Sequence, residues 1–288
     1  MEEVRNNREK NKVAGLSVLV ACGLVVFKLV VGIATGSLGI LSEALHSALD
    51  SVAAFITWVA VRISDKPADN EHNFGHGKIE NFSALIESLL LLITCGWIIY
   101  EAIVRLTSKH IEIEVGFWSF AVVITSILVD IGRARALKKA AKKFRSQALE
   151  ADALHFSTDI WSSSVVLVGI ICAYFEIYSA DAIAALCVAI LAIWVSIRLS
   201  LRAVDQLLDK APEGLREQVS ELIGSVEGVI LSHDLRVRCS GCVYIIDVNI
   251  HVAPTLTIVQ AHEISETVEK LLRANIGESI INVHIEPA

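Results

Sequence analysis

Six apolar runs, each long enough to cross a membrane, restrict the fold of this chain more than any other feature. A helix needs about 20 apolar residues to cross roughly 30 Å of hydrocarbon. The chain is 54% hydrophobic with a mean hydropathy of +0.58, which is more apolar than a water-soluble globule usually is. We therefore predict a polytopic all-α membrane domain with six transmembrane helices, at 13–34, 38–62, 80–106, 116–137, 149–175 and 181–204.

Basic residues indicate which ends of these helices face the cytoplasm, because lysine and arginine collect in cytoplasmic loops. The opposite loops, near Gly36, Ser108 and Tyr178, are uncharged or contain mostly acids. We expect both termini to be cytoplasmic. The basic residues stand before the first run and between the fourth and fifth runs, as Arg5, Arg8, Lys10, Lys12, Arg133, Arg135, Lys138, Lys139, Lys142, Lys143 and Arg145.

The end of the chain reads as a small cytoplasmic domain. Polarity rises after the sixth run and Pro212 marks a linker, so we divide the chain into a transmembrane domain at 1–206, a linker at 207–212 and a cytoplasmic domain at 213–288. Its hydrophobic periodicity predicts an α+β domain of order αββαβ, ferredoxin-like or metallochaperone-like, with the helices on one face of a three-stranded sheet. The five elements fall at 214–226, 229–238, 243–252, 257–274 and 281–286.

Two of the membrane runs carry the same pattern of ionisable residues. "EALHSALD" in the second run and "DALHFSTD" in the fifth both read acid, Ala, Leu, His, three residues, Asp. Residues four apart share one face of a helix, so His46 with Asp50, and His155 with Asp159, can each hold one ion. A charge inside a membrane helix costs about 2.5–3.5 kcal/mol on insertion scales and is kept where it pairs or lines a pathway.

These two helices facing each other would supply two imidazole nitrogens and two carboxylate oxygens, a set that suits Zn²⁺. A site buried in the bilayer indicates passage of the metal. The unperturbed pKa of histidine, about 6.5, lets a proton compete with the metal near neutral pH. We interpret Glu43 and Asp152 either as acceptors for the imidazoles or as charges at the entrance. The predicted transport site consists of His46, Asp50, His155 and Asp159.

The tail contains a second group of candidate ligands. Histidines with polar neighbours alternate on two of its predicted strands, and another lies on the polar side of its second helix. Leu231 and Leu235 flank His233 and predict that it points toward a buried face. Together with one acid these histidines make a nitrogen and oxygen set for a divalent ion, namely His233, His251, His262, His284 and Glu286.

Two further patterns in the tail are less specific. Cys239 and Cys242 form a C-x-x-C, which fits a thiolate metal site or a redox switch; we favour two residues beside a hairpin turn in a reducing compartment. "HEISE" resembles the H-E-x-x-H of zinc proteases, but Glu266 stands where the second histidine belongs. We therefore do not expect an enzyme.

With six runs, His-x-x-x-Asp in the second and fifth, and a histidine-bearing α+β tail, the chain resembles the cation diffusion facilitator family over nearly its whole length. "DNEHNFGHGKIE" is similar to that family's loop between the second and third spans. The resemblance implies a loop metal site at Asp69, His72 and His76, a charged pair at the dimer interface formed by Lys78 and Asp209, and a hydrophobic gate at Leu154.

The resemblance also implies a homodimer in a lipid bilayer that alternates between inward- and outward-facing states and exports Zn²⁺ from the cytoplasm in exchange for protons. Zn²⁺ would be both the substrate and a structural or regulatory ion of the tail. Transport of Cd²⁺, Fe²⁺, Mn²⁺ or Co²⁺ stays open, as does a non-transporting membrane metal sensor or scaffold acting through the tail. No nucleic-acid partner is expected. Short loops without a histidine-rich insertion indicate a bacterial or archaeal inner (plasma) membrane.

Overall fold

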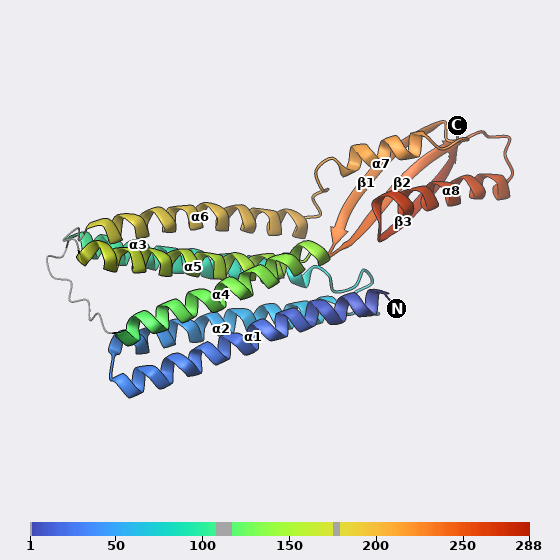
Figure 1. Cartoon of the computed structure of the whole chain (residues 1–288). Helices are drawn as coiled ribbons and strands as arrows, with labels where there is room; N and C mark the ends of the chain where they lie inside the picture. Colours follow the sequence, from blue (N-terminus) through green and yellow to red (C-terminus); the bar gives the residue numbers. More distant parts are fainter. Residues whose placement is uncertain (1, 108–116, 175–178) are drawn as a thin grey trace. The chain divides into compact units, whose positions relative to one another are not determined.

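The computed structural model describes residues 2–107, 117–174 and 179–288, and each predicted apolar run is a long helix there (Figure 1). The loops near Ser108 and Tyr178, whose charges indicate the orientation of the helices, lie outside the described residues. The prediction of a helical membrane part followed by a small α+β part is confirmed. The six helices are α1 (Glu2–Thr35), α2 (Leu38–Ser64), α3 (Ile79–Thr107), α4 (Phe117–Phe144), α5 (Gln147–Tyr174) and α6 (Ser179–Leu207).

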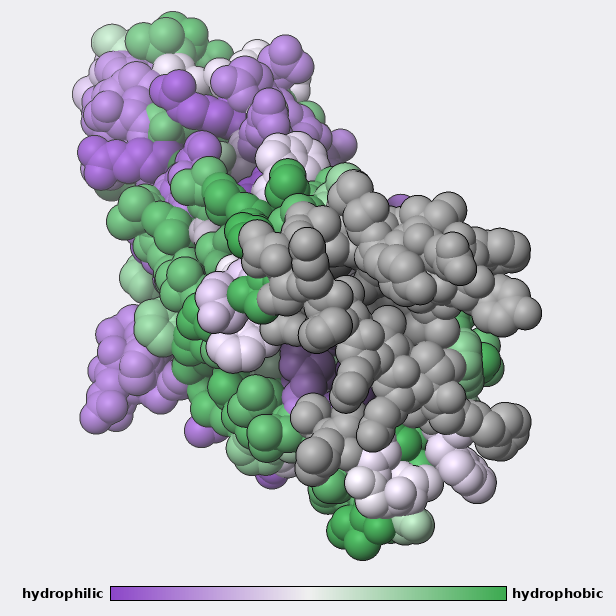
Figure 2. Space-filling view, turned by 90° about the vertical axis from the view of Figure 1, so that its left-hand side faces the viewer, coloured by the Kyte–Doolittle hydropathy of each residue, from purple (hydrophilic) through white to green (hydrophobic). Residues whose placement is uncertain are grey.

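The outside of the helical part is apolar, as expected for a surface that meets lipid. Within the described residues, four helices are long and apolar enough to cross a membrane: Asn7–Thr35, Glu43–Ser64, Ile79–Val104 and Leu186–Leu207. Figure 2 shows apolar side chains over much of the described surface. Many large ones are more than half exposed, among them Leu19, Ile33, Ile93, Trp97, Leu128 and Trp194.

A buried polar cluster joins the ends of several helices in this part. The Lys10 Nζ of α1 lies 2.5 Å from Asp65 Oδ1, just beyond α2, and 2.7 Å from Glu80 Oε1 of α3. The Ser64 hydroxyl donates to the same Glu80 carboxylate at 2.9 Å, and so does the hydroxyl of Ser146, which precedes α5. Burial raises the pKa of Asp65, and the ammonium of Lys10 compensates its charge. Buried ion pairs are kept where further hydrogen bonds satisfy the partners, as they do here.

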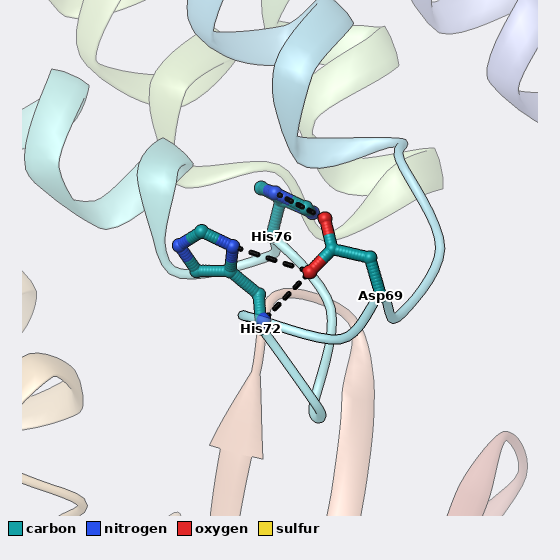
Figure 3. Close-up of side chains that lie close together, drawn as sticks. All are labelled: Asp69, His72 and His76. Carbon is teal, nitrogen blue, oxygen red and sulfur yellow. Dashed lines mark hydrogen bonds and ion pairs between the residues drawn. The ribbon is translucent and has the colours of Figure 1, made fainter.

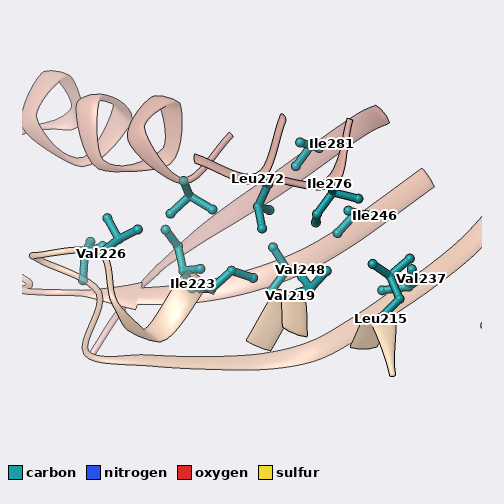
Figure 4. Close-up of a cluster of buried hydrophobic side chains, with 13 residues drawn as sticks. Leu215, Val219, Ile223, Val226, Val237, Ile246, Val248, Leu272, Ile276 and Ile281 are labelled. Carbon is teal, nitrogen blue, oxygen red and sulfur yellow. The ribbon is translucent and has the colours of Figure 1, made fainter. Parts of the chain in front are cut away.

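The tail has the predicted order αββαβ, with α7 (Leu215–Gly224), β1 (Leu231–Ser240), β2 (Val243–Val252), α8 (Ile258–Ile276) and β3 (Ser279–Pro287). The sheet order is β1-β2-β3, with β1 antiparallel and β3 parallel to β2. Alternate side chains of β2 and side chains of both helices meet in one apolar core (Figure 4). Both helices therefore cover the same face of the sheet, and the other face carries the polar residues of the strands. The core includes Val219, Ile223, Ile246, Val248 and Leu272.

The chain divides into two compact units, Met1–Lys66 with Ile79–Ala203, and Pro67–Lys78 with Val204–Ala288. The loop between α2 and α3 therefore belongs to the unit of the tail. A Cβ atom on Gly77 would come within 2.7 Å of the backbone nitrogen of Gly241, in the turn between β1 and β2. The hydroxyl of Ser240 donates to the carbonyl of Phe74 at 3.4 Å. The predicted linker at 207–212 stays a prediction.

Candidate functional site

Three of the four predicted transport-site residues meet between α2 and α5. His155 Nε2 lies 3.2 Å from Asp50 Oδ1 and 3.7 Å from Asp159 Oδ2. One possible ligand atom from each of the three lies within 4.8 Å of the other two. The side chains are 6%, 13% and 16% exposed for His155, Asp50 and Asp159. One nitrogen and two oxygen donors are thus concentrated inside the helical part.

His46, the fourth predicted residue, lies at the edge of this group. Its Nε2 is 3.9 Å from Asp50 Oδ1, and its side chain is 44% exposed. The spacing of four residues along α2 predicts this neighbour correctly. The spacing does not predict whether the His46 side chain contacts α5, because that depends on how the two helices pack. His46 is therefore beside the group formed by Asp50, His155 and Asp159, and is not among its mutually close atoms.

Asp152, one turn before His155, is buried in a polar chain that crosses three helices. Its Oδ2 accepts a hydrogen bond from Ser17 of α1 at 3.4 Å, and Ser17 accepts one from Arg133 of α4 at 3.2 Å. Arg133 also donates to Asp130 at 3.0 Å. The Nδ1 of His155 has no hydrogen-bond partner among the described residues, so Asp152 does not accept from that imidazole in this arrangement.

Glu43, one turn before His46, has a different partner. Lys28 of α1 donates to Glu43 at 3.1 Å and to Ser47 at 2.8 Å. The lysine is buried and the acid half exposed. Glu43 is thus tied to a cation of the neighbouring helix, at the end of the polar face that leads to Asp50.

The repeated pattern does not identify Lys28, Asp130 or Glu87, and the topology signal includes Arg133 only as one of the basic residues before the fifth run. Each lies inside an apolar run. That location is itself a signal, because an ionisable residue within a membrane helix is by default a candidate for function. The repeated His-x-x-x-Asp pattern identifies candidate residues in α2 and α5 only.

Leu154, the predicted gate, lies on α5 directly before His155. It is partly buried and packs against small and apolar side chains of α3, α5 and α6. The contact places an apolar side chain between these helices, next to the histidine. The packing partners are Ala84, Ala151, Leu199 and Ala203.

The side chains of the loop residues Asp69, His72 and His76 converge (Figure 3). His72 Nδ1 lies 3.4 Å from Asp69 Oδ1, and His76 Nε2 lies 3.6 Å from Asp69 Oδ2. The backbone amides of His72 and Glu71 donate to Asp69 Oδ1 at 2.6 and 3.0 Å. The hydrogen bond from the His72 amide is the main cause that lowers the pKa of Asp69. An ionised carboxylate and two imidazoles form a donor set for a divalent metal.

The predicted charged pair is present in the same unit. Lys78 Nζ, just before α3, lies 2.7 Å from Asp209 Oδ1, just after α6. Arg238 of β1 donates to the other oxygen of Asp209 at 3.2 Å. The hydrogen bond from Lys78 is the main cause that lowers the pKa of Asp209. The pair thus joins the loop, the segment after α6 and the tail sheet.

The tail ligands form a smaller group than predicted. Atoms of His233, His251 and Glu286 lie within 4.8 Å of one another, with Glu286 Oε2 3.3 Å from His233 Nε2 and 3.5 Å from His251 Nε2. The side chains stand on the face of the sheet opposite the apolar core. They come from all three strands, because the register sets His251 against Glu286 and β1 runs beside β2.

His233 does not follow the alternation that Leu231 and Leu235 predicted, and Leu231 is exposed. The register of β1 against β2 shifts between His233 and Arg236. Asp234 has a φ of 51° within this irregularity, a left-handed value that is uncommon outside glycine. A bulge of this kind turns the following residues to the other face, which the alternation alone does not reveal.

Of the two other predicted tail ligands, His284 lies at the edge of this group and His262 lies apart from it. His284 Nε2 is 3.8 Å from Glu286 Oε1, and its side chain is 66% exposed. His262 lies on α8, in the helix layer across the sheet from the group, where Glu266 is 3.5 Å from its Nε2. Within one chain, His262 therefore stands apart from His233, His251 and Glu286.

Cys239 and Cys242 flank and enter the turn between β1 and β2, as the hairpin interpretation predicted. Cys239 is buried at the end of β1, and Cys242 is exposed in the turn. Neither belongs to a group of three possible metal ligands among the described residues.

Comparisons with known proteins cover both parts of the chain. The family model described as a cation efflux transmembrane domain matches residues 15–208, and that described as a cation efflux protein cytoplasmic domain, a dimer domain by its name, matches 211–288. The cation-efflux pump FieF of Cronobacter sakazakii is 29% identical over 96% of this chain and 92% of its own length. FieF of Salmonella arizonae is 31% identical over 93% and 89%, respectively.

Proposed function

The chain belongs to the cation diffusion facilitator family of cation efflux transporters, and from this premise we propose that it exports Zn²⁺ in exchange for protons. It is a multi-pass membrane protein of a transporter family and not of an enzyme family. The finer parts of the proposal are the metal, the exchanged proton, the homodimer and the residues that bind the metal.

The meeting of His155, Asp50 and Asp159 between two helices is the observation that carries the proposal. An imidazole nitrogen and two carboxylate oxygens lie within 4.8 Å of one another, and such donors suit Zn²⁺. We assign His46 as the fourth ligand, since its Nε2 is 3.9 Å from Asp50 and a small rearrangement of an exposed side chain brings it closer. The absence of thiolates from this set disfavours copper(I).

Protons supply the means of release. Binding of a metal requires neutral imidazole and ionised carboxylates, so protons and metal compete for the same atoms. Lowering the pH on the receiving side would then displace the metal, and raising it on the other side would favour loading. In alternating access the site opens to one side at a time, and Leu154 would close the path on one side.

The loop and tail sites would regulate this exchange. Asp69, His72 and His76 would bind one divalent ion, and His233, His251 and Glu286 another, with His284 and His262 contributing as the arrangement changes. The tail would hold two copies of the chain together more tightly when metal is bound. The match to a cytoplasmic dimer domain supports a homodimer. Its place would be a bacterial or archaeal inner membrane, with both termini in the cytoplasm.

Zinc flux into proteoliposomes under an imposed pH gradient tests the proposal. We expect flux that follows the gradient for the wild type, and loss of flux for Asp50→Ala. Cd²⁺, Fe²⁺, Mn²⁺ and Co²⁺ in parallel identify the preferred metal. Transport of one of these but not of Zn²⁺ would replace the proposed substrate. No flux of any metal by wild-type dimer in intact vesicles would favour the sensor or scaffold.

A further inference from the structure

Glu87 is a fully buried acid in the helical part that the proposed transport site does not use. It lies on α3, 2% exposed, and neither of its carboxyl oxygens has a hydrogen-bond partner among the described residues. Asp152 Oδ1 on α5 is also buried and without such a partner. The hydroxyl of Ser83, one turn from Glu87, is a third buried polar group of this kind. Buried polar atoms without partners are rare in proteins and call for an explanation.

Glu87 and Asp152 lie close enough to act on each other, and Asp152 is the one charged group that acts on Glu87 among the described residues. The two helices pack together here, since Ala84 and Ala151 lie in one buried cluster. Ser88, the neighbour of Glu87, is engaged by hydroxyls of α6. Glu87 thus lies near another acid, and the side chains of both are buried among the helices.

The other charged groups near this pair act on Asp152 and not on Glu87. Arg133 of α4, His155 of α5 and Asp50 of α2 all act on Asp152. Of the two arginines of α6, Arg202 is paired with Glu150 of α5 at 2.9 Å, and Arg198 lies over the ring of Trp194. Among the described residues no lysine or arginine pairs with Glu87.

Two carboxyl groups enclosed together do not both ionise readily. Burial without a partner disfavours a charged carboxylate strongly, and a second carboxylate nearby disfavours it further. A proton on one of the two removes both penalties, as in other enclosed carboxyl pairs. The unpaired oxygens of Glu87 are therefore best satisfied by an O–H on that side chain.

We propose that Glu87 is a proton-binding residue that loses its proton when a divalent metal binds beside His155 and regains it when the metal leaves. The inference rests on the proposed metal and proton exchange and names one of its proton carriers. A metal ion near His155 brings positive charge next to Asp152, one turn away, and so offsets the repulsion between Asp152 and Glu87. The O–H bond of Glu87 then breaks, the carboxylate keeps the electron pair, and the proton passes to solvent.

Counting protons released per zinc bound tests this directly, using the full chain in detergent, weak buffer and a pH indicator. We expect Glu87→Gln to bind zinc with an affinity within about threefold of wild type, because no proposed ligand changes, and to release about one proton fewer per metal bound. Glu87→Asp, which can still ionise, should restore that proton. Glu150→Gln, an exposed acid of α5, is the matched control and should release protons as wild type does.

Infrared difference spectroscopy of the wild type reports the same event without transport. Addition of zinc should remove a carbonyl band of a protonated carboxyl group, and this loss should be missing in Glu87→Gln. If wild-type vesicles move no metal while the band persists and responds, the proposed function falls and the proton on Glu87 stands. Equal proton release by wild type and Glu87→Gln, no such band, or loss of one bound zinc in the variant would overturn the inference.

Discussion

Asp159 contributes a carboxylate oxygen 3.7 Å from His155 Nε2 and no apolar surface. Asp159→Ala should therefore remove one donor and abolish zinc flux, with at least a hundredfold loss, while the protein inserts and elutes from size-exclusion chromatography as wild type does. Asp205→Ala, which removes an exposed acid paired with Lys210, is the control and should keep its flux. Flux of Asp159→Ala within threefold of wild type would exclude this acid from the transport site.

Asp209 leads to a pH dependence that has a definite sign. Its pKa is lowered by the hydrogen bond from Lys78, so its contribution to stability is complete above the ordinary value of 3.8 and is lost as pH falls through the lower folded value. Asp209→Asn should lower the melting temperature at pH 7 by an amount equivalent to no more than about 1 kcal/mol, because the pair is partly exposed.

The difference between wild type and Asp209→Asn should be constant from pH 7 to about pH 5 and shrink below pH 4, since protonation then removes the same charge. Melting curves of the full chain at each pH give this difference. Glu217→Gln, on the exposed face of α7, controls for a general loss of charge. A difference that grows as the pH falls would contradict the assignment.

Spacing along the sequence predicts which ligands are neighbours within one helix, but not which ligands meet between helices. His-x-x-x-Asp placed His46 beside Asp50 correctly, because the rule concerns one helix. Which of these atoms face α5 depends on helix packing, and there His155 is closer to Asp50 than His46 is. The face of His233 is not predictable for a similar reason, since a bulge in β1 changes that face and no alternation pattern contains this information.

Among the structural elements, the loop between α2 and α3 depends on one close backbone approach. A Cβ on Gly77 would lie 2.7 Å from the Gly241 nitrogen. This distance is too short for a non-bonded contact, so the backbone of the loop or of the hairpin would have to move. Gly77→Ala should therefore loosen the loop from the hairpin and speed tryptic cleavage after Lys78 by roughly tenfold, which corresponds to about 1.4 kcal/mol.

Limited proteolysis of the full chain followed by mass spectrometry measures this cleavage. Gly23→Ala, in α1 with nothing within 4 Å of the new methyl group, should cleave like wild type. Unchanged cleavage in Gly77→Ala would mean that the loop tolerates displacement from the hairpin.

The helices and strands themselves were predictable because each has a long, regular signal. Runs of about 20 apolar residues and strict alternation identify elements without tertiary information. The docking of 67–78 against the hairpin has no such signal. It depends on Gly77 meeting Gly241, two residues far apart in the chain, and glycines in a loop indicate a turn as readily as a contact.

At the scale of the whole transporter, mutations in the tail group of His233, His251 and Glu286 should have effects that are separable from those in the proposed transport site. His251→Ala removes a ligand from the group with His233 and Glu286. We expect one zinc fewer bound per chain and a smaller zinc-induced rise in melting temperature, with zinc flux at least a tenth of wild type. Zinc content by elemental analysis and flux in the same preparation decide this. Flux lost as completely as in Asp159→Ala would show that the tail group is part of the transport path.

The inclusion of 67–78 in the unit of the tail affects how the protein can be taken apart. The polypeptide passes between the two units at 66/67, at 78/79 and at 203/204, so three covalent connections join them. Removing everything after residue 206 would cut one connection. The loop would remain, but Gly77 and Phe74 would lose their contacts with Gly241 and Ser240. A tail expressed alone would lack a piece of its own packing. Complementation with separately produced halves is therefore expected to fail unless the loop is supplied with the tail.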